Sequence, residues 1–317
     1  MTPAAAVAWP VGARSAASFS FDVDAESAVL FADPSSAGRM SVMSHQAYGP
    51  VTGVPRLLAL LERHGVRSTF FVPGYTALRY PDTVRRIADA GHELACHGFL
   101  HETLVGVDRE TEAGYLDRGL DALAQVAGRR PVGYRAPMWE LNWHSPQLLL
   151  ERGFLYDSSL MDADVPYELA VGDGSLVEIP IQWALDDWEQ YCYLPDLSGS
   201  GLIESPAKVL ELWSLELEAV RAEGGCFVLT NHPFRPAGRP AHGRWRNWSS
   251  GRRPRTTSGS RRWATSRPTC GRSDWLRAPW SARSCRTLPL DPAGPPAPGP
   301  APAVRQRRPM TSAPSPA

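Results

Sequence analysis

The sequence predicts an α/β fold in which a parallel sheet closes into a (β/α) barrel. Apolar, strand-like runs alternate with helix-like runs through residues 18–232, and this alternation is typical of parallel sheets. Polar motifs directly follow several of the strand-like runs, and the loops after the strands build the active sites of α/β barrels. We prefer a barrel to an open sheet because a barrel brings residues that are far apart in sequence to one mouth.

The first half of this region contains three predicted strands and three predicted helices. Leucines repeat with helical spacing from Leu57 to Leu61, and Gly65 after them is a helix stop. The run of β-branched and aromatic residues that ends at Pro73 predicts a strand. We therefore expect strands at Ala17–Phe21, Val66–Val72 and Glu93–Cys96, and helices at Val54–His64, Asp82–Ala90 and Asp108–Val126.

The second half repeats the alternation with three strands and two helices. Ser145 followed by Pro146 is a typical helix start, with Ser145 as the cap, and Gly224 is a typical helix stop. We expect strands at Val132–Tyr134, Leu176–Trp183 and Cys226–Thr230, and helices at Ser145–Arg152 and Pro206–Glu223.

Residues 25–50 form a long segment rich in Ser, Gly and Met, and we expect no regular structure there. Loops of this length are uncommon inside a domain and are often functional. Two interpretations stay open, a lid or substrate wall and a mobile surface loop.

The composition indicates a globular protein and its cellular location. The chain has 317 residues, of which 43% are hydrophobic, so it can bury a sizeable core. It contains no uncharged apolar run of the ~18 residues that a membrane span needs, and the stretch from Met1 to Ser18 lacks the features of a signal peptide. Five widely spaced cysteines make disulfides improbable. We expect a cytoplasmic protein that does not enter membranes.

The charge of the chain is divided between its two ends. Residues 1–232 hold 31 acidic and 16 basic residues, whereas residues 233–317 hold 2 acidic residues and 17 arginines. We expect an N-terminal extension at 1–16, a barrel domain at 17–234 and a tail of low order at 235–317, rich in Arg, Pro, Ser and Trp. We interpret the tail as an out-of-frame translation of a GC-rich gene; the rival interpretation is a basic arm that binds nucleic acid.

Two pairs of residues suggest a metal site. Asp22 and Asp24 are two apart and point the same way in an extended strand, although a solvated turn explains such a pair more often. His97 and His101 are four apart, a spacing that lets both imidazoles reach one ion. Asp24 with the two histidines makes a two-His, one-carboxylate set that leaves positions open for water and substrate. The ion acidifies the water, and a nearby carboxylate can take its proton.

Arg135 and His232 each follow a predicted strand. The guanidinium of Arg135 can hold the base carboxylate by paired hydrogen bonds, and a surface salt bridge is the alternative. His232 stands before Pro233 and is placed to protonate a leaving amine, which departs slowly without a proton donor. Further polar and aromatic groups at strand ends are candidate substrate contacts, with packing or support as the alternative: Trp139, Asp157, Trp183 and Asp187.

The order of these motifs resembles the polysaccharide deacetylase (carbohydrate esterase) family. The successive motifs of that family match Phe-Asp-Val-Asp at 21–24, His-Gly-Phe-Leu-His at 97–101, Arg-Ala-Pro at 135–137 and His-Pro at 232–233. Each motif alone is weak, but four in register across residues 17–234 are specific. Within the family, the sequence is most similar to the subgroup of peptidoglycan deacetylase-like and allantoinase-like proteins.

The resemblance implies a distorted (β/α) barrel that removes N-acetyl groups from amino sugars with a divalent metal ion. It makes Asp22 the base, positioned by Arg135, and His232 the acid. The metal ligands that it implies are Asp24, His97 and His101. Val23 separates the two aspartates, which are adjacent in most of the family but spaced as here in the subgroup. Residues 235–317 resemble neither the helix nor the strand that complete the family's barrel, so we expect the final βα unit to be missing.

Three hypotheses follow from the sequence. The first is a hydrolase of non-peptide carbon–nitrogen bonds that deacetylates N-acetylated carbohydrates. It uses a divalent metal ion, and zinc is the ion that we favour. The second is a cyclic amide or imide hydrolase of the allantoinase type with a small cyclic amide as substrate. The third is a truncated, inactive pseudoenzyme. We expect no nucleic-acid partner despite the basic tail, and the sequence leaves the oligomeric state open.

Overall fold

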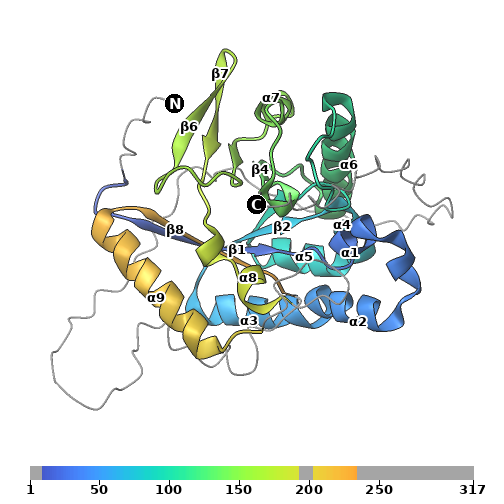
Figure 1. Ribbon diagram of the computed structural model, residues 1–317, viewed down its shortest axis with the longest axis horizontal. Coiled ribbons are helices and arrows are strands. Elements are labelled where there is room, and N and C mark those ends of the chain that lie inside the picture. The colour runs from blue at the N-terminus through green and yellow to red at the C-terminus, as the bar shows by residue number, and fades with distance from the viewer. Residues whose placement is uncertain (1–8, 193–202, 234–317) are drawn as a thin grey trace, which may run out of the picture. The chain divides into compact units, whose positions relative to one another are not determined.

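The computed structural model of the protein describes residues 9–192 and 203–233 (Figure 1). An eight-stranded sheet runs through this part of the chain in the order β6-β7-β5-β4-β3-β2-β1-β8. Its strands are β1 (Ala16–Asp22), β2 (Thr69–Val72), β3 (Glu93–Cys96), β4 (Gly133–Tyr134), β5 (Tyr156–Asp157), β6 (Tyr167–Val171), β7 (Gly174–Glu178) and β8 (Cys226–Asn231). Neighbouring strands are parallel except for β6 and β7, which form an antiparallel hairpin at the top of Figure 1.

Helices connect the strands and cover the sheet. They are α1 (Ser27–Ala32), α2 (Met40–Tyr48), α3 (Val54–His64), α4 (Gly74–Arg79), α5 (Pro81–Asp89), α6 (Arg109–Ala127), α7 (Ser145–Glu151), α8 (Trp188–Tyr191) and α9 (Pro206–Glu223). Short turns of other helix types are η1 (Pro34–Gly38), η2 (Gly49–Gly53), η3 (Pro137–Trp139) and η4 (Trp183–Leu185). Parallel strands alternating with helices confirm the distorted (β/α) barrel that the sequence predicts.

The barrel is open between β6 and β8, because no strand pairing joins them within the described residues. The predicted loss of the final βα unit concerns residues 235–317, and residues 1–8 are part of the predicted N-terminal extension. Both segments lie outside the described residues, so the predicted division of the chain at 16 and 234 stays a prediction.

Most predicted elements are confirmed within three residues at each end. The helices α3 and α9 have the predicted bounds, and Gly65 and Gly224 end them in the left-handed conformation. One cap differs, since His144 precedes α7 as its N-cap and Ser145 lies inside the helix. The predicted strand Leu176–Trp183 is shorter than expected, because β7 ends before Pro180, which has no N–H to donate to a neighbouring strand.

Residues 25–50, which we expected to lack regular structure, are largely helical, and that prediction is wrong. The segment forms α1, η1 and α2. The helix α2 has weak apolar periodicity, so no continuous apolar stripe stabilises it. Val29 on α1 is instead buried against Val42 and Met43 on α2, with Cys192 from a distant part of the chain. Tertiary packing therefore stabilises helices that the local pattern does not reveal.

The main hydrophobic core lies between the sheet and the helices α3, α5 and α6. Leu60, Ile87 and Leu123 from these helices are fully buried in the same core cluster as Phe70 of β2. Each such side chain contributes ~1.5–3 kcal/mol relative to exposure. This packing fixes the strands whose ends form the site.

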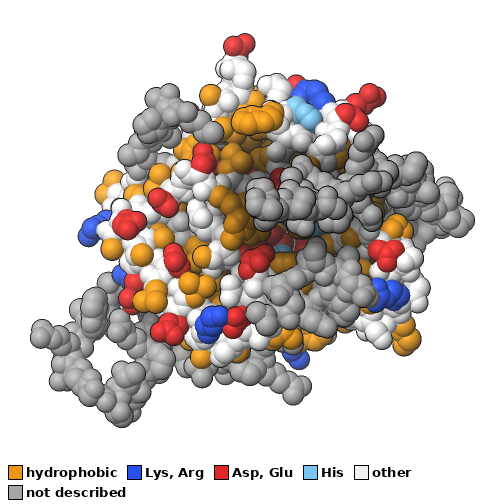
Figure 2. All heavy atoms as spheres, viewed as in Figure 1, with side chains coloured by type: hydrophobic (Ala, Val, Ile, Leu, Met, Phe, Trp, Pro, Cys, Tyr) orange, Lys and Arg blue, Asp and Glu red, His pale blue; other side chains and the backbone are white. Residues whose placement is uncertain are grey.

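Figure 2 shows many Asp and Glu side chains and few Lys and Arg side chains on the visible face, as the charge of residues 1–232 predicts. Every helix in the described ranges is too short or too polar to cross a bilayer.

Candidate active site

The predicted catalytic and metal-binding residues lie at or just beyond the carboxyl ends of β1, β3, β4 and β8. The register pairs Phe21 on β1 with Asn231 on β8, and Cys96 on β3 with Tyr134 on β4. Parallel strands in register end at the same edge of the sheet, so the residues just after them meet there. Asp22 at the end of β1 is at least 93% buried, and so are the five predicted residues beyond β1, β3, β4 and β8: Asp24, His97, His101, Arg135 and His232.

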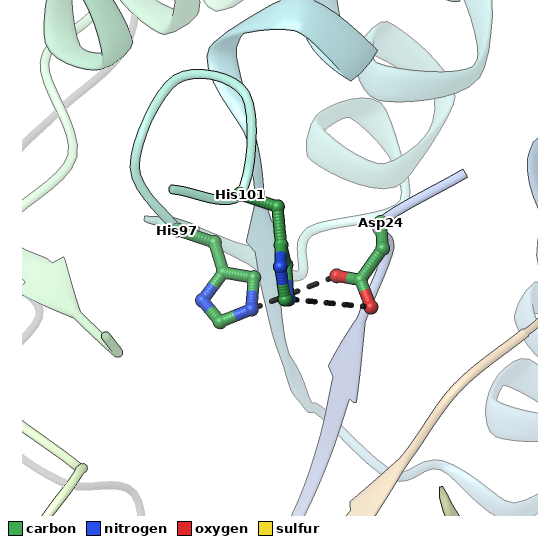
Figure 3. A group of neighbouring side chains, drawn as sticks. All are labelled: Asp24, His97 and His101. Carbon is green, nitrogen blue, oxygen red and sulfur yellow. Dashed lines mark ion pairs between the residues drawn. The ribbon is translucent and has the colours of Figure 1, made fainter. Parts of the chain in front are cut away.

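Asp24, His97 and His101 come together as the sequence predicts, with potential ligand atoms within 4.8 Å of one another (Figure 3). The Nε2 atom of His97 lies 3.6 Å from Asp24 Oδ1, and that of His101 lies 3.8 Å from Asp24 Oδ2. These distances are too long for hydrogen bonds, but they are of the order expected for ligands that each sit ~2 Å from a shared ion.

The surroundings of the three side chains prepare them to bind a cation. Both carboxylate oxygens of Asp24 are buried and receive no hydrogen bond from a described residue. The Nδ1 atom of His97 is 2.7 Å from the carbonyl oxygen of Arg135 and donates to it, which leaves the Nε2 lone pair for a ligand. Burial lowers the pKa of His101 to about 4, so this imidazole is neutral near pH 7, as metal ligation requires. The donor set fits a divalent cation.

The backbone is strained at or next to two of these three candidate ligands. Among the described residues, four that are not glycine have positive φ, and two of them are His101 (φ 59°) and Ala25 (φ 52°), which follows Asp24. Such residues persist where the surrounding structure holds them, and they gather at functional sites. The hydroxyl of Thr76 donates to the Asp24 carbonyl and secures this turn.

Asp22 and Arg135 form a fully buried ion pair. The Nη1 atom of Arg135 donates to Asp22 Oδ1 at 2.8 Å and also to the Ser20 hydroxyl at 3.0 Å. Burial alone would raise the pKa of Asp22, but the positive charge of Arg135, together with His97 and His232, outweighs it and the net shift is downward. Asp22 is therefore ionised, and its second oxygen Oδ2 receives no hydrogen bond from a described residue.

His232 lies across the site with its two ring nitrogens in different surroundings. Its Nε2 is 3.7 Å from Asp24 Oδ2, whereas its Nδ1 is 2.8 Å from Asp187 Oδ1 and 3.4 Å from Asp186 Oδ1. Burial lowers the pKa of this histidine, but the carboxylates of Asp186 and Asp187 outweigh burial and raise it well above the ordinary value. A protonated imidazole with Nδ1 held by a carboxylate points its other N–H into the site.

The four predicted substrate contacts have different surroundings. Trp139 and Trp183 stack with ring centroids 4.2 Å apart, and Trp183 is 45% exposed, so the pair offers an aromatic surface. The carboxylate of Asp187 accepts hydrogen bonds from the Nδ1 atom and from the backbone N–H of His232. Asp157 is fully buried and accepts a hydrogen bond from the Ser159 hydroxyl. Substrate contact stays a prediction for all four.

Sequence reasoning missed two groups that support the site. Ser20, two residues before Asp22 on β1, accepts a hydrogen bond from Arg135. Glu178 accepts hydrogen bonds from the backbone N–H groups of Ser159 and Leu160, which follow the Arg135 partner Ser158. The available signal for Glu178 is that it is the one carboxylate in the apolar run 176–183. A charge in an apolar strand needs a buried partner.

Comparisons with known proteins identify the family of this chain. The family model described as polysaccharide deacetylase matches residues 41–155. A peptidoglycan deacetylase of Helicobacter pylori is 30% identical over 217 residues, which are 60% of this chain and 74% of that protein. A crystal structure of a candidate polysaccharide deacetylase from Mycobacterium smegmatis is 63% identical, with a TM-score of 0.75 over 78% of this chain and 88% of that one.

A solved allantoinase shares the fold. The PuuE allantoinase structure is 24% identical, with a TM-score of 0.66 over 77% of this chain and 86% of that one. The fold, the motif order and the similarity to the Helicobacter pylori and Mycobacterium smegmatis proteins lead to one conclusion. The chain belongs to the polysaccharide deacetylase family, whose members are hydrolases of carbon–nitrogen bonds other than peptide bonds.

Proposed function

We propose that this chain is a divalent-metal-dependent deacetylase that acts on N-acetylated carbohydrates. The observation that carries the proposal is the meeting of Asp24, His97 and His101, with Asp22 and His232 beside them. Two imidazoles and one carboxylate suit zinc and other first-row divalent ions, and zinc is the ion we propose. The related Helicobacter pylori protein is named for removing acetyl groups from peptidoglycan, which supports an amino-sugar substrate.

The residues divide the work of amide hydrolysis between them. A divalent ion, when bound, supplies Lewis-acid chemistry by acidifying water and polarising a carbonyl oxygen. Asp22 takes a proton from the attacking water at Oδ2, because Arg135 occupies Oδ1 and keeps the carboxylate ionised. His232 gives the proton at Nε2 to the departing sugar nitrogen, since Asp187 holds the Nδ1 proton.

The aromatic pair supports a carbohydrate substrate. Trp183 presents an exposed indole face that is held flat by its stacking on Trp139. Sugar rings stack on such faces through their C–H groups, and a rigid aromatic surface loses little entropy on binding. The cyclic-amide alternative is supported by likeness of fold alone, so we treat it as an outcome of the test.

The test combines metal analysis with a substrate panel. We expect the purified protein to carry one divalent ion per chain and to release acetate from chitooligosaccharides, to lose activity on chelation, and to regain it with Zn²⁺. Asp24→Asn should weaken metal binding by at least about tenfold. Asp173→Asn removes an exposed carboxylate and is the matched control, with metal content and activity unchanged.

Three results would contradict the proposal in different ways. Full activity with the metal verified absent would reject metal dependence. Hydrolysis of allantoin or hydantoins, but not of chitooligosaccharides, would assign the cyclic-amide activity. A folded, metal-loaded protein with no activity on either set would identify an inactive relative.

A further inference from the structure

Two carboxyl groups are buried side by side behind the site. Asp157 on β5 and Glu178 on β7 are paired in the parallel register, and both are 0% exposed. Residues paired in register on adjacent strands project to the same face of a sheet. Burial of two carboxylates on directly paired residues is costly unless their charge is reduced.

Hydrogen bonds account for one oxygen of each carboxyl group. Glu178 Oε1 accepts from the backbone N–H groups of Ser159 and Leu160 at 3.1 and 2.9 Å, and Asp157 Oδ1 accepts from the Ser159 hydroxyl at 2.8 Å. The other oxygens, Asp157 Oδ2 and Glu178 Oε2, are buried and receive no hydrogen bond from the described N–H and O–H groups. They are hydrogen-bond partners of each other once one of them carries a proton.

The groups around the pair do not neutralise both carboxylates. Arg135 acts on Asp157 from the loop after β4, while Tyr134 on β4 and Tyr167 on β6 are neutral phenols near pH 7. Burial, and then the neighbouring Asp157, raise the pKa of Glu178 to about 10. One proton between the two carboxyl groups removes the repulsion and satisfies both remaining oxygens.

The pair is connected to the reaction centre through the segment 158–160. The Ser159 hydroxyl accepts from the Ala136 backbone N–H at 2.9 Å. The carbonyl and hydroxyl oxygens of Ser158 accept from Arg135 Nε and Nη2 at 3.0 and 3.1 Å. Arg135 in turn holds Asp22. A shift of the 158–160 segment would therefore move the guanidinium and the carboxylate that it orients.

We propose that Asp157 and Glu178 share one proton and act as positioning residues, locking the 158–160 segment against Arg135 and thereby fixing Asp22. The inference rests on the proposed function only in giving Asp22 a catalytic role. The shared proton itself has readouts that do not depend on activity.

Three variants separate positioning from mere stability. Glu178→Gln keeps the shape and supplies an N–H in place of the shared proton, so it should retain most of the wild-type kcat on chitooligosaccharides. Glu178→Ala should lower kcat by at least about tenfold at unchanged metal content. Glu93→Gln changes a partly buried glutamate at the opposite end of the strands and should leave kcat unchanged.

Two physical measurements detect the proton. The infrared difference between wild type and Glu178→Gln at pH 7.5 should contain the carbonyl band of a neutral carboxylic acid. The folded pKa of Glu178 lies above its ordinary value of 4.5, so the folded protein keeps a proton that the unfolded chain releases. Between these values, the unfolding equilibrium constant of the wild type should rise by about tenfold per pH unit relative to Glu178→Gln.

Each outcome decides the inference. A difference spectrum with only ionised carboxylate bands, or equal pH dependence of unfolding in the two proteins, would overturn the shared proton. Equal losses of kcat in Glu178→Gln and Glu178→Ala, with the proton detected, would overturn the positioning role. If the wild type hydrolyses no chitooligosaccharide, the proposed function fails, while the spectroscopic and stability results still decide whether the proton is shared.

Discussion

At the scale of single residues, Arg135 connects most of the site. Its side chain binds Asp22, Ser20 and Ser158, its carbonyl accepts from His97, and its guanidinium lies 4.1 Å from the centre of the Phe71 ring. The residue is 0% exposed, so its charge is tolerated only through these contacts. Replacing it would leave the carboxyl group of Asp22 in the core without its partner.

We therefore predict an asymmetric cost for the two charges. Arg135→Met should reduce the free energy of unfolding by ~3–5 kcal/mol, because the carboxylate of Asp22 stays buried without its partner. Asp22→Asn in the same chain removes that carboxylate, so the double variant should recover part of the loss. Urea unfolding of the wild type, both single variants and the double variant measures the coupling. Strictly additive effects would contradict the account.

At the scale of elements, the long helix α6 supports the loop that carries the histidines. Gly119 on α6 packs against this loop, and a Cβ atom at Gly119 would lie 2.5 Å from the carbonyl oxygen of Gly98 and 3.1 Å from Cys96 Sγ. Gly98 directly follows the proposed ligand His97. The helix therefore approaches the site loop more closely than any side chain allows.

Two glycine variants on α6 test this contact against helix propensity. Gly119→Ala should destabilise the protein by ~1–3 kcal/mol through overpacking, and it should weaken metal binding because Gly98 has to move. Gly114→Ala, on the same helix with open space around it, should stabilise the protein by ~0.5–1 kcal/mol. Melting curves and metal titrations measure both. Equal effects of the two variants on stability and metal binding would show that the close contact between α6 and Gly98 does not hold the loop in place.

At the scale of the whole molecule, stability depends on charges far from the site. His92 precedes β3 at the opposite end of the strands, is 3% exposed, and accepts a hydrogen bond from the Ser68 backbone N–H. Burial, with a contribution from the charge of Arg67, lowers the pKa of His92 to about 4. The folded protein thus holds this imidazole neutral where the unfolded chain binds a proton.

The sign of the pH dependence follows from that difference. Because the folded pKa of His92 is below the ordinary value of 6.5, its contribution to stability is present above pH 6.5 and is lost as the pH falls towards 4. We predict that His92→Gln unfolds with a weaker dependence on pH between 6.5 and 4 than the wild type. Urea midpoints across this range provide the measurement, and parallel curves would refute the assignment.

The sequence predicted the fold and the central residues of the site because their signals are local. Helix α3 has a leucine repeat and a glycine stop, and each motif directly follows an apolar strand, so parallel pairing alone brings Asp22, His97 and His232 to one edge. Residues 25–50 were missed because their helices depend on a distant contact with Cys192. Glu178 was missed because its partner is fixed by the pairing of β5 with β7.

By itself, the sequence determined most of the strands that carry the site, the main helices between them, their order, and which side chains stand at the strand ends. Only the tertiary structure decided the partners of those side chains: Asp187 holds His232, and Asp157 faces Glu178 rather than open solvent. The physical reason is that periodicity and strand ends are properties of neighbouring residues. A buried charge, in contrast, acquires its partner from strands and loops that fold together across the chain.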